Sequence, residues 1–90
     1  MSDQPTLEQL FHKAVAESTS SIKEKPDNQT LLKLYALYKQ ASIGDININP
    51  PSNPFDIVAM AKYNAWQELK GKSQEDAMRE YIQLVEQLKG

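Results

Sequence analysis

Tyrosines and lysines provide the side-chain chemistry that stands out in this sequence. Tyr35 and Lys39 are four residues apart and Tyr38 lies between them, so a helix would place two rings and an ammonium group on one side. Lys62 adds a second cation and Tyr81 a further phenolic hydroxyl. Aromatic rings stack on nucleotide bases, and lysines bind phosphates. The same spacing also fits core tyrosines and lysines with solvated ammonium groups, so spacing alone leaves both interpretations open.

Other functional classes find little support in the residue types. The chain has no cysteine and a single histidine, His12, beside the apolar face of the first expected helix. Because we find no serine nucleophile motif, glycine-rich phosphate loop or paired metal-ligand spacing, we expect no enzyme activity, metal or cofactor. Ten basic and twelve acidic side chains give a net charge of -2, which lacks the basic excess typical of nucleic-acid binding.

The apolar periodicity predicts that four helices position these side chains. The expected helices cover about residues 7–22, 28–42, 55–70 and 74–88, with apolar residues at three- and four-residue steps. Thr6 and Gln9 can form a capping box for the first helix, Ser73 can cap the last, and Gly71 fits a left-handed helix end. We therefore expect an all-α four-helix bundle in a single domain, residues 1–90.

A long segment with three prolines, residues 43–54, separates the second and third expected helices. About twelve extended residues reach ~40 Å, whereas a helix of about sixteen residues is ~24 Å long. This crossover loop can therefore span the bundle, which permits an up-down-down-up order with the second and third helices parallel. Ile46 and Ile48 alternate with asparagines, and we expect both isoleucines to pin the loop to the core.

The overall composition is typical of a soluble globular chain. Apolar residues make up 40% of the sequence and charged residues 24%. The apolar runs are only a few residues long, and the first five residues lack the basic start of a signal peptide. We therefore expect a cytoplasmic protein.

Several ordered motifs resemble the acyl-CoA-binding protein family. The segment YKQASIGDIN, Tyr38 to Asn47, followed by Pro51, strongly resembles the family signature. Further similar segments are AKYNAW at 61–66, LKGKS at 69–73 and EDAM at 75–78. The resemblance extends over about residues 8–90. It implies an up-down-down-up bundle that binds long-chain fatty acyl-CoA esters without a cofactor.

The resemblance also implies roles for individual residues around the nucleotide. Tyr35 would stack on the adenine, and Lys39 and Lys62 would hold the region of the 3′-phosphate. Tyr38 would line the same site, and Tyr81 would form a hydrogen bond near the head group.

For the acyl chain, the resemblance implies contacts with Leu32 and Val15. Each buried methylene contributes ~0.8 kcal/mol, so a long chain supplies up to ~10 kcal/mol before the costs of association. Such a protein would buffer and carry acyl-CoA, with transient contact to membranes or acyl-CoA-using enzymes, and we expect a monomer.

The sequence departs from the family pattern at a few positions. Tyr63 stands where the family commonly has tryptophan, Thr19-Ser20 replaces a common lysine, and Val58 and Met60 stand where basic residues are common. The head-group site is therefore less cationic than usual. We expect either weaker affinity with less salt dependence, or an altered preference for chain length.

Two other functions fit a bundle of this kind. A helical adaptor would use the apolar groove for a peptide or partner helix, although it would have no need for Tyr35, Lys39 and Lys62 together. An esterase or transferase acting on acyl-CoA would need a nucleophile and base, which we do not find in the sequence.

Overall fold

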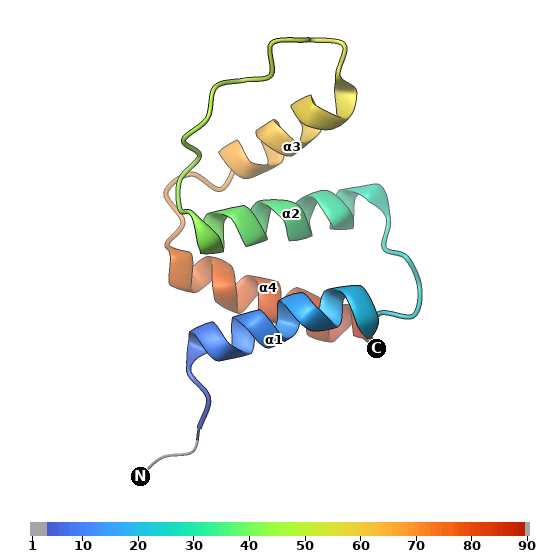
Figure 1. The fold of residues 1–90 in the computed structure, drawn as a ribbon, viewed down its shortest axis with the longest axis vertical. Helices are drawn as coiled ribbons and strands as arrows, with labels where there is room; N and C mark the ends of the chain where they lie inside the picture. The colour runs from blue at the N-terminus through green and yellow to red at the C-terminus, as the bar shows by residue number, and fades with distance from the viewer. Residues whose placement is uncertain (1–3, 90) are drawn as a thin grey trace.

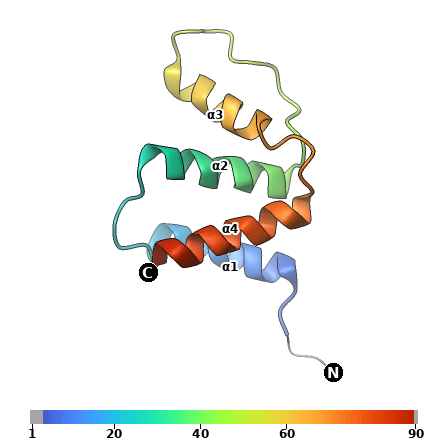
Figure 2. The same ribbon diagram turned by 180° about the vertical axis from the view of Figure 1, so that it is seen from behind.

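The structure, a computed structural model, describes residues 4–89, which fold into four helices (Figure 1). The helices are α1 (Leu7–Ser20), α2 (Asn28–Ser42), α3 (Ile57–Gln67) and α4 (Gln74–Lys89). In both views α2 lies between α3 on one side and α1 with α4 on the other (Figures 1 and 2). Helices α1 and α4 run in one direction and α2 and α3 in the other, so the predicted all-α, up-down-down-up order is confirmed. None of the four described helices is both long and apolar enough to cross a membrane.

Each helix begins at a side chain that caps its free backbone N–H groups. Thr6 and Gln9 form the predicted capping box, with donor–acceptor distances of 2.9 and 3.1 Å. Asp27 caps α2, Asp56 caps α3, and Ser73 accepts a backbone N–H of the first turn of α4. These caps fix where each helix starts.

The main hydrophobic core joins α1, α2 and α4. Its buried members are Phe11, Ala14, Leu34, Leu37, Ala41, Ala77, Tyr81 and Val85. Helix α4 packs against both α1 and α2, whereas α3 packs against α2 alone among the described helices. No described residue of α3 belongs to this core, so α3 is held by its packing against α2 and by interactions outside the core.

Two helices are shorter than the sequence predicted. Helix α3 starts at Ile57 instead of residue 55, because the Asp56 side chain caps it, and it ends at Gln67 instead of residue 70. Helix α1 ends at Ser20 instead of residue 22. There the hydroxyls of residues 18–20 donate to backbone carbonyls of the preceding turn, as expected for residues that compete for backbone hydrogen bonds.

The crossover loop runs from the end of α2 across to the start of α3 (Figure 1). The prediction that Ile48 pins this loop is wrong, because 52% of its surface is exposed. Ile46 is half-buried. The first residues of the loop are held instead by polar contacts with the turn between α3 and α4.

Gln40 is at the centre of these contacts. Its side chain has no exposed surface, and its amide donates to Asp45 Oδ1 at 2.9 Å and to the Lys72 carbonyl at 2.7 Å. Asp45 Oδ1 also accepts the Gly71 N–H at 2.8 Å. One buried amide and one carboxylate therefore connect the end of α2 to the turn before α4.

Trp66 adds a further connection from α3 itself. Its indole N–H donates to the Gly44 carbonyl at 3.0 Å, and the ring is almost completely buried. Gly44 and Gly71 have φ values of +104° and +95°, which glycine adopts without strain. We call this set the polar junction: Gln40, Gly44, Asp45, Trp66, Gly71 and Lys72.

The polar junction predicts a dependence of stability on pH. The Gly71 N–H, and then the Gln40 amide, hold the pKa of Asp45 below its usual value of about 3.9. The stabilising effect of the Asp45 charge is therefore complete above about pH 4 and is lost as the pH falls through the lowered pKa. Urea unfolding at a series of acidic pH values should show this loss.

Two substitutions separate the charge of Asp45 from its hydrogen bonds. Asp45→Asn keeps the accepting oxygen, so it should stay folded at neutral pH and lose less stability on acidification than the unmodified protein. Asp45→Ala removes the acceptor and should be the less stable variant at neutral pH. An unchanged acid dependence in Asp45→Asn would contradict this account of the junction.

Candidate functional site

The Tyr35 ring lies close to two lysine ammonium groups. The Nζ atoms of Lys39 and Lys62 are 5.9 and 5.4 Å from the ring centroid, within the range of cation–π contacts. Lys39 Nζ is also 5.7 Å from the Trp66 ring. Neither lysine forms an ion pair with a carboxylate in the part of the chain that the structure describes. We call Tyr35, Lys39 and Lys62 the cationic platform.

Two helices build this platform. Tyr35 and Lys39 are one turn apart on α2, as their spacing predicted. Lys62 comes from α3, which runs parallel to α2 (Figure 1). Because α3 packs only against α2 among the described helices, the polar junction at its C-terminal end helps to keep Lys62 beside Tyr35.

A groove of about 360 Å³ adjoins the platform on the α1 side of α2. We call it the α1–α2 groove, and its lining residues are Val15, Ser18, Thr19, Pro26, Leu31, Leu34, Tyr35, Tyr38 and Tyr81. Tyr35 belongs to both the platform and the groove, so the two form one continuous site. Among the lining residues, the hydroxyl of the buried Tyr81 donates to Ser18 Oγ at 3.1 Å.

The structure brings together six of the seven residues that the sequence singled out. Lys39 and Lys62 lie at the platform, and Val15, Tyr38 and Tyr81 line the groove that Tyr35 shares. Leu32 is the exception.

Leu32 lines a different groove, between α2 and α3. This α2–α3 groove has a volume of about 580 Å³ and is also lined by two charged side chains, Lys33 and Glu68. None of the three platform residues lines it. Leu31 lines the α1–α2 groove but was not among the predicted site residues. The signal was present, because Leu31 continues the three- and four-residue spacing that leads to Tyr35 and Tyr38.

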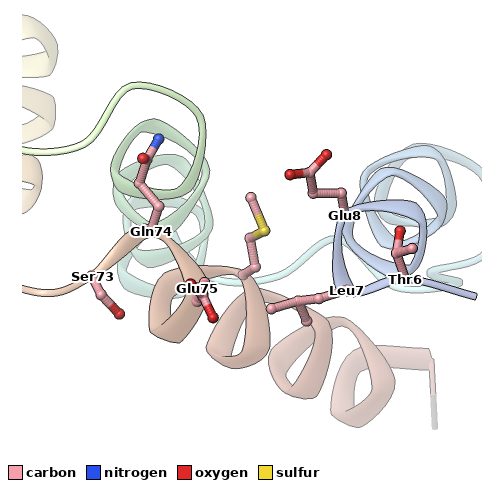
Figure 3. Close-up of a pocket in the computed structure, with 7 residues that line it drawn as sticks. Thr6, Leu7, Glu8, Ser73, Gln74 and Glu75 are labelled. Atoms are coloured by element: carbon pink, nitrogen blue, oxygen red, sulfur yellow. The ribbon is translucent and has the colours of Figure 1, made fainter.

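A larger cavity of about 700 Å³ lies where α1 and α4 begin (Figure 3). It is lined by Thr6, Leu7, Glu8, Ser73, Gln74, Glu75 and Met78. Two carboxylates and no cation line it, so it does not suit a phosphate-bearing ligand. Within residues 4–89, no three acidic, histidine or cysteine side chains gather into a metal site.

A platform of this kind can bind a base and phosphates, and the adjoining groove can bury an apolar chain. The aromatic face supplies stacking, and the two cations, which form no ion pair with a carboxylate among residues 4–89, supply charge for an anion. The groove walls are largely aliphatic and aromatic. The arrangement therefore suits an amphiphile with an anionic aromatic head and an apolar tail.

Comparisons with known proteins identify the family of this chain. The family model for acyl-CoA-binding protein matches residues 8–85. An acyl-CoA-binding protein of Saccharomyces cerevisiae is 48% identical over 82 residues, which cover 91% of this chain and 92% of that protein. One of Dictyostelium discoideum is 49% identical over 73 residues, covering 81% of this chain and 86% of that protein.

The fold is also found among solved structures. The crystal structure of acyl-CoA-binding protein 2 from Oryza sativa superposes with a TM-score of 0.85 at 34% identity, and the match covers 91% of this chain and 87% of the rice chain. Both the sequence and the fold therefore match over most of their length. The chain belongs to the acyl-CoA-binding protein family.

Proposed function

We propose that the protein binds fatty acyl-CoA esters non-covalently and carries or buffers them in the cell. The observation that supports this most strongly is the position of Tyr35, Lys39 and Lys62 beside the α1–α2 groove. An acyl-CoA ester joins an adenine nucleotide to an apolar chain. The platform suits the nucleotide, and the groove suits the chain.

The head group is held by stacking and charge. Adenine stacks on Tyr35, while Lys39 and Lys62 bind the 3′-phosphate region through charge-assisted hydrogen bonds. Lys62 is the one basic residue in α3, where Val58 and Met60 stand at positions that are commonly basic in the family. These contacts distinguish the CoA ester from a free fatty acid, which has no phosphate.

The acyl chain leaves the platform at Tyr35 and lies in the α1–α2 groove against Val15 and Leu31. Each methylene removed from water contributes ~0.8 kcal/mol, and part of this gain offsets the loss of freedom on association. Leu32 lies in the α2–α3 groove, away from this path. Because the groove binds the acyl chain and the platform binds the nucleotide, tight binding requires both parts in one ligand.

We further propose that the protein acts as a cytoplasmic monomer without catalysis. Binding needs no covalent step, cofactor or metal, so the ester is released unchanged to membranes or to acyl-CoA-using enzymes. A peptide-binding adaptor would have no use for two lysines beside a tyrosine ring, so we do not favour that role.

Calorimetric titration with palmitoyl-CoA, CoA and palmitate tests the proposed function. We expect tight binding of the ester and much weaker binding of each fragment, because head and tail contribute together. Free CoA should not accumulate during incubation with the ester. Absence of binding by palmitoyl-CoA, with the protein folded by circular dichroism, would refute the function.

Substitutions at the platform test how the head group is held. Tyr35→Phe should keep most of the affinity for palmitoyl-CoA, whereas Tyr35→Ala should lose ~1 to 3 kcal/mol of stacking. Lys39→Ala should weaken binding more than Lys33→Ala, because the exposed Lys33 lies outside the platform. Equal losses at the two lysines would contradict the assigned site.

Two neighbouring leucines test the path of the acyl chain. Leu31→Ala should weaken palmitoyl-CoA binding by about 1 kcal/mol, since it removes apolar contact in the α1–α2 groove. Leu32→Ala is the matched control and should change the affinity less. A larger loss for Leu32→Ala would place the chain in the α2–α3 groove instead.

A further inference from the structure

A tight turn at the end of the crossover loop presents a phenylalanine ring to solvent. Residues 53–56 form this turn, in which the Asp56 N–H donates to the Asn53 carbonyl at 3.1 Å. The Asn53 side-chain oxygen accepts the Phe55 N–H at 3.0 Å, and Pro54 occupies the second position, where its fixed φ favours a turn. Phe55 itself is 87% exposed. We call Asn53, Pro54 and Phe55 the NPF turn.

The NPF turn continues directly into α3. Its closing residue, Asp56, also caps the helix by accepting the Ala59 N–H at 3.1 Å. Figure 1 shows the start of α3 at the end of the helix remote from the turn to α4. Because hydrogen bonds on both sides fix the turn in advance, a partner that binds it pays little entropy to order it.

Phe55 has no packing role in the described fold. It belongs neither to the main core nor to the lining of the α1–α2 or the α2–α3 groove. Ile57 and Val58, which follow in the first turn of α3, are also 79% and 63% exposed. Apolar side chains gathered on the surface in this way mark interaction sites, because their burial against a partner is favourable.

The size of this apolar surface indicates what kind of contact it can make. Phe55, Ile57 and Val58 together expose roughly 400 Å². A specific and stable interface, such as that of a dimer, buries about 800 Å² on each partner. The surface therefore suits a weak, transient contact in which one side chain enters a pocket.

Charge favours a protein partner over a lipid surface. The sequence has no lysine or arginine between Lys39 and Lys62, and Asp56 directly follows Phe55. Anionic membranes attract basic segments, so this acidic segment does not suit them. A carboxylate beside the ring is instead complementary to a cation at the edge of a protein pocket.

We propose that the NPF turn is a docking motif for a protein module with an apolar pocket for the Phe55 ring. Polar groups of the module hold the Asn53 amide, and a basic side chain pairs with Asp56. The exposed Asn53 NH2 group is available for this contact, since it forms no hydrogen bond with other residues in the described range 4–89. The inference is independent of the proposed function, because no residue of the turn lines the α1–α2 groove or belongs to the cationic platform.

NMR titration of the 15N-labelled protein with a purified EH domain, a small helical module that binds Asn-Pro-Phe turns, tests this motif. We expect amide shift changes concentrated at residues 53–59, in fast exchange because the contact is small. Phe55→Ala should weaken binding by at least about thirtyfold, since it removes the anchoring ring. Ile48→Ala is the matched control and should bind like the unmodified protein, because Ile48 is an exposed apolar residue of the same loop outside the turn.

Asn53→Asp separates recognition of the amide from formation of the turn. The carboxylate can still accept the Phe55 N–H, so the turn persists, but the NH2 donor is lost. Binding of the EH domain should weaken by about fivefold. Circular dichroism of each variant checks that the helices are intact. A variant that bound as tightly as the unmodified protein would refute the role of the Asn53 amide and with it the assigned motif.

Other outcomes would also overturn the inference. The EH domain could leave the amide signals of residues 53–59 unchanged at millimolar concentration, or shift them as strongly in Phe55→Ala. In place of EH-domain binding, the protein could sediment with vesicles of phosphatidylcholine and phosphatidylserine and lose this property in Phe55→Ala, which would make the surface a membrane contact. Binding of palmitoyl-CoA is measured separately, so failure of either proposal leaves the other standing.

Discussion

The buried amide of Gln40 holds together the parts of the chain on which the site depends. It donates both to Asp45, just after α2, and to the Lys72 carbonyl, just before α4. Helix α3 is the element that needs this connection, since none of its described residues joins the main core. Because the Gln40 side chain is buried, breaking either bond would leave one of its amide N–H groups unpaired away from water. The polar junction thereby fixes α3 beside α2 and Lys62 beside Tyr35.

Helix α2 contributes residues to both parts of the site, the cationic platform and the α1–α2 groove. Tyr35 belongs to both, since its ring lies near the two lysines and the residue also lines the α1–α2 groove. This arrangement explains how a chain with a net charge of -2 can bind an anionic ligand: the two cations are concentrated at one ring and have no carboxylate partner among the described residues. The local field, and not the net charge, determines what this surface attracts.

Local patterns in the sequence predicted where α1 and α4 start, because hydrogen bonds between residues a few positions apart determine these helix starts. Thr6 and Ser73 cap the starts of α1 and α4 through hydrogen bonds within three residues, as expected. Gly71 has the expected positive φ but lies in the turn beyond α3, which already ends at Gln67. The contacts of Gln40 were not predictable in this way, because its partner Lys72 is thirty-two residues away. The sequence also could not show which of the neighbouring residues Leu31 and Leu32 faces the groove. They differ by about 100° around α2, and the position of the other helices decides which of them faces the groove.

The most direct test of the account is an NMR measurement of intermolecular nuclear Overhauser effects in the complex with palmitoyl-CoA. One ligand should give contacts from its adenine protons to the Tyr35 ring, and from its acyl chain to the methyl groups of Val15 and Leu31. This result would establish that the platform and the α1–α2 groove hold the two halves of the same molecule. Adenine contacts away from Tyr35, or acyl contacts confined to Leu32 and Ala61 in the α2–α3 groove, would contradict it.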